Sequence, residues 1–141
     1  MNEFLSSWAP RILSVLRIIT GFLFLWHGSQ KLFAFPPSPQ MPPADAFMIF
    51  AGVLEFGGGL LILLGLFTRW VAFILCGMMA VAYWMAHGTS GKGFLPLMNG
   101  GELAVLYCFV FLYFFFAGGG VWSLDNLLLR RNTDNVVEEN T

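Results

Sequence analysis

Four ionisable residues lie in or at the ends of four apolar stretches, and they are the candidates for chemistry. They are His27, Glu55, His87 and Glu102. Placing a carboxylate in the hydrocarbon of a bilayer costs roughly 2.5–3.5 kcal/mol, so Glu55 must face a polar interior, have a partner or hold a proton. Imidazole titrates near neutrality and carboxyl groups exchange protons. The four residues together therefore predict hydrogen bonding and proton transfer within a membrane.

A second group of polar and aromatic residues is predicted to line the same pocket. Its members are Gln30, Lys31, Tyr83, Trp84 and Asn99. The first two follow His27 by three and four positions, and the next two precede His87 by four and three. Residues at these spacings share one face of a helix. With these faces turned inward, we expect an aromatic-walled pocket in the outer half of the membrane.

The composition is that of an integral membrane protein. The 141 residues are 57% hydrophobic and 11% charged, with a mean hydropathy of +0.73, whereas soluble domains average about 25% charged residues. The net charge of -1 and the lack of a basic block give no indication of nucleic-acid binding. Cys76 and Cys108 lie within apolar stretches and form no Cys-x-x-Cys motif, so we interpret them as small packing residues.

Helix length and apolar content predict four membrane spans in a single domain covering residues 1–141. The spans are residues 10–33, 45–67, 68–87 and 99–118, followed by a short interfacial helix at 123–131 and a polar tail at 132–141. About 20 residues at 1.5 Å each cross a hydrocarbon core of about 30 Å. The fold predicted is an all-α, integral membrane four-helix bundle. Thr68 is the expected N-cap of the third helix.

The distribution of basic residues predicts the orientation. With four spans, both termini lie on one side, together with Arg11, Arg17, Arg69, Arg130 and Arg131. The other side holds Lys31 and Lys92. The positive-inside rule then places the N- and C-termini in the cytoplasm of a multi-pass protein of a bacterial-type inner (cell) membrane.

Each candidate also has a structural interpretation. Glu55 could pair with Arg17, which differs from it in depth by about 6 Å. Lys31 could extend its ammonium group to the interface, and His87 could stabilise the end of a helix as a cation. Asn99 and Glu102 have the spacing of a capping box.

Several motifs together carry a family resemblance. They are R-I-x-x-G-x-x-F-L-x-H-G-x-x-K-L at 17–32, G-x-L-E-x-x-G-G-L-L-x-x-x-G-L-x-T-R at 52–69, H-x-x-x-G from His87, N-G-G-E at 99–102 and G-G-x-W-S-L-D at 119–125. In their order and spacing the chain resembles the DoxX family of small four-helix membrane proteins. Members of that family are associated with quinone-linked oxidation, including thiosulfate:quinone oxidoreductase. The resemblance implies a four-helix membrane fold and, by analogy, redox function.

Two kinds of function follow. As a quinone-linked oxidoreductase subunit, the protein would use His27 or His87 to hydrogen-bond a quinone, Glu55 to carry a proton and Glu102 to reach the outer water. The sequence has no dinucleotide-binding motif and no iron–sulfur cysteine pattern, so electrons would come from the substrate or a partner protein. The alternative is a non-catalytic membrane module, either an accessory subunit packed beside a larger membrane redox complex or a binder of lipid or quinone. The expected partners are the lipid bilayer, quinone, and another membrane or redox subunit or a second copy of this chain. A third, less favoured possibility is a haem held axially by His27 and His87, or a metal held by the two histidines and two glutamates. The sequence has no Glu-x-x-His pair of the kind found in di-iron bundles.

Overall fold

The computed structural model describes residues 2–39, 45–89 and 91–130, and every regular element in these ranges is helical. The elements are α1 (Asn2–Phe33), α2 (Ala46–Leu64), α3 (Thr68–Ala82), the π-helix η1 (Tyr83–Gly88), α4 (Pro96–Asn99) and α5 (Glu102–Ala117). Residues 124–130 are also helical, where the sequence predicts an interfacial helix. The predicted all-α class is confirmed. The predicted polar tail at 132–141 lies outside the described residues.

Three helices within the described ranges are long and apolar enough to cross a membrane. They cover Glu3–Phe33, Ala46–Leu64 and Thr68–Gly88, the last combining α3 with η1. The apolar helix α5 has 16 residues, or about 24 Å, which is less than a hydrocarbon core of about 30 Å. The prediction of a helical membrane protein is confirmed. A fourth crossing at 99–118 and the cytoplasmic termini stay predictions.

The chain divides into two compact units. One comprises Met1–Thr68 with Gly119–Thr141, and the other comprises Arg69–Gly118. The single transmembrane domain expected over residues 1–141 stays a prediction.

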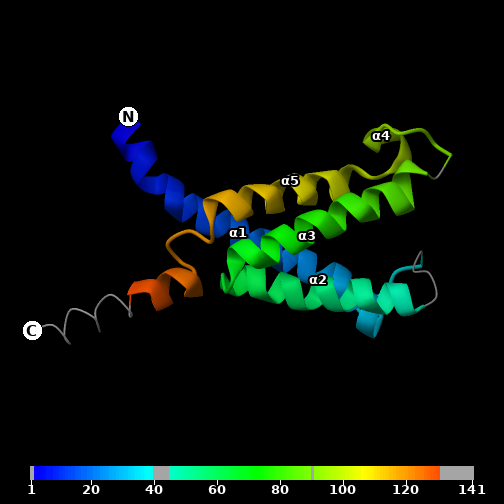
Figure 1. Ribbon diagram of the computed structural model, residues 1–141, viewed down its shortest axis with the longest axis horizontal. Coiled ribbons are helices and arrows are strands. Elements are labelled where there is room, and N and C mark those ends of the chain that lie inside the picture. The colour runs from blue at the N-terminus through cyan, green and yellow to red at the C-terminus, as the bar shows by residue number, and fades with distance from the viewer. Residues whose placement is uncertain (1, 40–44, 90, 131–141) are drawn as a thin grey trace, which may run out of the picture. The chain divides into compact units, whose positions relative to one another are not determined.

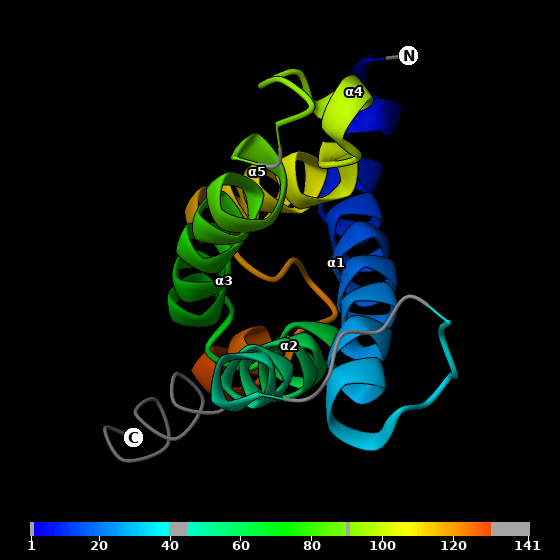
Figure 2. The ribbon, with the colours of Figure 1, turned by 90° about the vertical axis from the view of Figure 1, so that its right-hand side faces the viewer.

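In the first unit, α2 packs closely against the C-terminal half of α1 (Figures 1 and 2). Glycines allow the two backbones to approach. A Cβ atom on Gly28 would overlap the backbone of Phe56 and lie 2.8 Å from the carbonyl oxygen of Gly52. A Cβ atom on Gly59 would lie 2.8 Å from the backbone nitrogen of Leu25. Small residues are typical of such close helix contacts in membranes.

Local chemistry sets both ends of α2. Asp45 begins the helix, because its carboxylate accepts a 2.7 Å hydrogen bond from the backbone N–H of Met48. Gly65 ends it in a left-handed conformation (φ 71°), and its N–H donates to the carbonyls of Leu61 and Ile62. Glycine adopts this conformation without steric penalty. The helix therefore stops three residues before the predicted end at residue 67.

Arg17 is fully buried and fastens the end of α2 to the segment after α5. Its guanidinium donates to the carbonyls of Ile62 and Leu63, to that of Gly119 at 2.8 Å and to that of Trp122 at 2.7 Å. The carbonyls in the last turn of a helix lack partners within the helix, and they attract cations. The alternative that Arg17 pairs with Glu55 is wrong.

Asp125 supplies the cap expected from Thr68. Its two carboxylate oxygens accept the backbone N–H groups of Phe67 at 2.7 Å and Thr68 at 2.8 Å. The hydroxyl of Thr68 is buried and has no hydrogen-bond partner among the described residues. The predicted capping by the Thr68 side chain is therefore wrong. A carboxylate 57 positions later in the chain performs that role.

In the second unit, α3 and α5 run antiparallel (Figure 1). Near the start of α3, Arg69 donates to the carbonyls of Phe115 and Phe116 at the end of α5, at 3.0 and 2.8 Å. The ring of Phe73 contacts that of Phe115 at a centroid distance of 5.3 Å. The first turns of α3 are thereby fixed to the last turn of α5.

Candidate functional site

A buried ion pair joins the first two helices. The ammonium group of Lys31 on α1 binds one carboxylate oxygen of Glu55 on α2. The Glu55 side chain is only 4% exposed, and that of Lys31 is 26% exposed. The second oxygen of Glu55 is buried and has no hydrogen-bond partner among the described residues. The sequence singled out Glu55, and the structure identifies Lys31 as its partner.

Glycine makes this pairing sterically possible. Gly52 lies three residues before Glu55 on the same face of α2, and a Cβ atom there would come within 2.9 Å of the Cβ atom of Lys31. The backbone of α2 therefore leaves room for the lysine stem. The interpretation of Lys31 as an interfacial anchor is wrong, because its charge is used inside the helix pair. The glycines three positions before Lys31 and Glu55 were the signal in the sequence for this contact.

His27 and Gln30 lie beside the pair on α1. His27 precedes Lys31 by one helical turn, is half-buried and interacts electrostatically with Lys31. Gln30 is also half-buried. The ring of Trp26 packs between those of Phe22 and Phe35, at centroid distances of 5.8 and 5.9 Å. The first unit thus places an imidazole one helical turn before an ammonium group that binds a carboxyl group.

The candidates of the second unit form a hydrogen-bonded network around Tyr83. Its hydroxyl donates to the carbonyl of Phe94 and accepts a 3.3 Å hydrogen bond from the side-chain amide of Asn99. The same amide donates to the carbonyl of Gly93 at 3.1 Å. Asn99 and Tyr83 are both buried. The network holds the loop after η1 against the end of that helix.

His87 joins this network through its ring. Its Nδ1 lies 3.0 Å from the backbone carbonyl of Asn99, and since a carbonyl only accepts, Nδ1 carries the proton. The amide oxygen of Asn99 accepts the N–H of Gly101, the N-cap residue of α5. The predicted Asn99–Glu102 capping box is therefore wrong. Trp84 is 59% exposed and packs edge-on against Tyr83.

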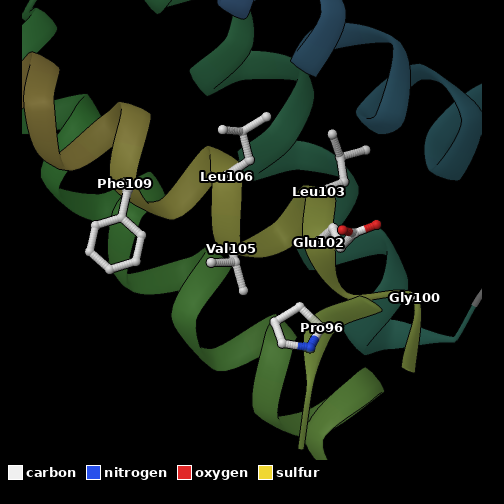
Figure 3. Close-up of a pocket in the computed structure, with 7 residues that line it drawn as sticks. All are labelled: Pro96, Gly100, Glu102, Leu103, Val105, Leu106 and Phe109. Atoms are coloured by element: carbon white, nitrogen blue, oxygen red, sulfur yellow. The ribbon is translucent and has the colours of Figure 1, made fainter. Parts of the chain in front are cut away.

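Glu102 begins α5 and is exposed. Its position suits the positive end of the helix dipole. It borders an open groove of about 770 Å³ whose other lining residues are Pro96, Gly100, Leu103, Val105, Leu106 and Phe109. Figure 3 shows Pro96 of α4 beside the first turns of α5, from which the other side chains project. Apart from this carboxylate, the side chains that line the groove are apolar.

The structure thus forms two groups of candidates. His27, Gln30, Lys31 and Glu55 belong to the first unit, and Tyr83, Trp84, His87, Asn99 and Glu102 belong to the second. Their convergence in one pocket stays a prediction. Among the described residues, no three of the His, Cys, Asp and Glu side chains come together in a way that could hold a metal ion.

Removing the hydroxyl of Tyr83 is expected to loosen the loop after η1. The substitution Tyr83→Phe deletes two hydrogen bonds and leaves the carbonyl of Phe94 without that donor, a loss of about 1–2 kcal/mol. Amide hydrogen exchange of residues 91–95 should accelerate by about tenfold. Tyr113→Phe is the matched control, since Tyr113 is 54% exposed. Equal exchange in the two variants would contradict the assigned role.

Long apolar helices, with a buried ion pair between the first two, define the chain as a helical integral membrane protein. It belongs to the DoxX family, whose model matches residues 12–88. The sequence resemblance to this family is therefore confirmed.

Three relatives have similar lengths. An uncharacterised protein of Haemophilus influenzae is 44% identical over 136 residues, which is 93% of this chain and 100% of the relative. The inner membrane protein YqjF of Escherichia coli is 31% identical over 121 residues, 83% of this chain and 92% of the relative. The uncharacterised membrane protein Rv3486 of Mycobacterium tuberculosis is 31% identical over 142 residues, 88% of this chain and 85% of the relative. No solved structure matches.

Proposed function

We propose that this protein is a small membrane subunit of a quinone-linked oxidoreductase, with its quinone site at Lys31 and Glu55. One observation carries the proposal. A buried carboxylate is paired through one oxygen, while its other oxygen has no hydrogen-bond partner among the described residues. Ionisable groups buried in membrane helices commonly mark proton and substrate sites. An oxygen that still needs a donor suits a ligand that carries hydroxyl groups in its reduced form.

The side chains around Glu55 have the chemistry that a quinone requires. When bound, a quinone accepts two electrons and two protons. The ammonium of Lys31 and the imidazole of His27 can each donate a hydrogen bond to a carbonyl oxygen. Glu55 can hold a proton and pass it on. Phe56, the residue after Glu55, packs edge-on against Phe33 at a centroid distance of 5.4 Å, and these rings offer an apolar surface for a planar ring.

The remaining parts of the proposal concern partners and placement. Within the second unit, His87 would hydrogen-bond through its ring and Glu102 would exchange protons with the outer water. The N- and C-termini would lie in the cytoplasm, and the protein would sit in the inner membrane, as its relative from Escherichia coli does by name. A second redox subunit, or another copy of this chain, would provide the connection to the electron donor.

Substitutions of the ion pair test the proposal. Glu55→Gln keeps the shape of the side chain but cannot carry a proton. We expect normal membrane insertion and at least tenfold less quinone retained by the protein purified in mild detergent, measured by solvent extraction and ultraviolet absorbance. Lys31→Met is expected to destabilise the fold by about 3–5 kcal/mol, because it leaves a buried charge unpaired. The double variant, which carries Glu55→Gln and Lys31→Met, removes both charges. It should recover stability, but it should not recover the retained quinone.

A matched control uses the exposed lysine of the second unit. Lys92→Met should change neither quinone content nor stability, since Lys92 is exposed. If Glu55→Gln lost folded protein while quinone per folded molecule stayed constant, the proposed quinone site would be wrong. That result would instead favour an accessory subunit.

The accessory role is the second candidate, and the packing of the first unit favours it. Arg17 binds four backbone carbonyls, and glycines bring α1 and α2 into backbone contact. These features stabilise a helix pair and need no ligand. In this role the ion pair of Lys31 and Glu55 fixes the register of α1 against α2.

A further inference from the structure

The two cysteines of the chain meet in the second unit. The sulfur atoms of Cys76 on α3 and Cys108 on α5 lie 3.7 Å apart, within sulfur hydrogen-bonding distance, although 32 positions separate them in sequence. Both are free thiols and both are half-buried. The interpretation of these residues as separate packing residues therefore misses their contact. A disulfide bond has a sulfur separation of about 2.05 Å, so the two sulfur atoms must approach each other further to form one.

Both thiols lie well inside apolar helices. Cys76 is about 12 Å from the start of the apolar helix Thr68–Gly88 and about 18 Å from its end. Cys108 is about 9 Å from the start of α5 and about 14 Å from its end. Charged, water-soluble oxidants do not enter hydrocarbon at this depth. A lipid-soluble oxidant reaches it, and the quinones of bacterial membranes accept electrons from dithiols.

We propose that Cys76 and Cys108 form a membrane-embedded dithiol that passes two electrons to a quinone. The two S–H bonds break and one S–S bond forms. The dithiol loses two electrons and two protons. The quinone takes up these two electrons and two protons and becomes a quinol. The cysteine pair thus supplies the electron-carrying group that the sequence motifs lack. The choice of acceptor rests on the proposed quinone-linked function.

Because the chain has only two cysteines, an intramolecular disulfide can form in only one way. The full-length protein, reduced and purified in detergent, is incubated without oxygen with a short-chain ubiquinone. We expect the maleimide-reactive thiols to fall from two per chain to none, the intact mass to drop by two hydrogens, and one quinol to form per chain. Oxidised glutathione, which is charged, should leave both thiols reactive. Cys76→Ser and Cys108→Ser should each keep one reactive thiol and form no quinol.

Three results would overturn the inference. If the thiols stayed reactive after incubation with the quinone but formed a disulfide with the small oxidant diamide, the quinone would be excluded as the electron acceptor. Thiols that close with neither reagent would exclude the redox pair. A mass increase by one quinone would indicate addition to a thiol in place of oxidation.

The Glu55→Gln variant separates this inference from the proposed function. If the Glu55→Gln variant formed the disulfide and retained quinone as the wild type does, that result would support the dithiol and contradict the quinone site at Lys31 and Glu55. If the wild-type protein retained quinone but formed no disulfide, the quinone site would be supported and the dithiol proposal would be wrong.

Discussion

Replacing Arg17 by leucine is expected to lower the free energy of unfolding by about 3–5 kcal/mol. The side chain is completely buried. Its loss removes the donors for four backbone carbonyls, two at the end of α2 and two in the segment 119–122. Each buried polar group left without a partner costs about 1–3 kcal/mol, and partial entry of water reduces the sum.

The negative charge near Arg17 makes the substitution more damaging. Asp125 interacts electrostatically with the guanidinium and also caps the start of α3. With leucine at position 17, this carboxylate loses its nearby cation. The free energy of unfolding of Arg17→Lys should lie between that of the wild type and that of Arg17→Leu. An ammonium group keeps the charge, but its three donors radiate from one point and cannot serve four separated carbonyls.

Arg11 provides the matched control on the same helix. It is exposed, donates to the carbonyl of Ser7 and lies over the ring of Trp8 at 5.4 Å. Arg11→Leu should change stability by less than about 1 kcal/mol, because exposed interactions of this kind contribute little. The measurement is equilibrium unfolding in detergent, followed by circular dichroism. Similar losses for the two arginines would show that charge at the membrane boundary, and not the buried carbonyl contacts, determines stability.

The substitution Gly28→Ala is expected to destabilise the first unit by about 2–3 kcal/mol. A methyl group there overlaps the backbone of Phe56 on α2, and backbone cannot move aside as a flexible side chain can. The helices must separate, and overpacking of this kind typically costs about 1–3 kcal/mol. Gly28 lies one turn before Lys31, so separation also lengthens the distance between Lys31 and Glu55. Quinone content should therefore fall together with stability.

Gly57 on α2 is the control for this prediction. A Cβ atom there meets nothing within 4 Å, so Gly57→Ala should stabilise the protein by about 0.5–1 kcal/mol, the usual gain from replacing glycine inside a helix. Opposite signs at Gly28 and Gly57 would show that the close approach of α1 and α2, and not helix propensity, requires glycine at position 28. The same unfolding measurement distinguishes them. Two stabilising substitutions would contradict the tight contact between α1 and α2.

Two cations of α1, the buried Arg17 and the half-buried Lys31, illustrate why position decides the role of a charge. Arg17 faces the carbonyls at the end of a helix, whereas Lys31 faces a carboxylate in the middle of one. A planar guanidinium can serve several carbonyls at once, and a compact ammonium suits a single carboxylate. Both arrangements neutralise polar groups where water is scarce. Only the second leaves an acid oxygen without a partner among the described residues.

The sequence by itself determined the helical membrane class and the family, and it singled out Glu55 as an acid that needs a partner or a proton. These follow from properties that are local along the chain, namely apolar length, motif spacing and a carboxylate in an apolar stretch. It also indicated, through glycines on the Glu55 face, that this face packs against another helix. Helix ends were less predictable, since α2 stops where Gly65 turns left-handed and α3 is capped by Asp125 from far along the chain.

Only the tertiary structure decided which polar groups meet. Three pairings depend on how helices rotate and slide against each other, and one chain's periodicity does not fix those quantities. Glu55 pairs with Lys31 and not with Arg17. Asn99 hydrogen-bonds Gly101 and Tyr83, and it does not form a capping box with Glu102. Cys76 contacts Cys108. In hydrocarbon, a polar group takes whichever partner packing brings within reach, because water offers no alternative. The partners of these residues therefore follow from the packing of whole helices and not from sequence spacing.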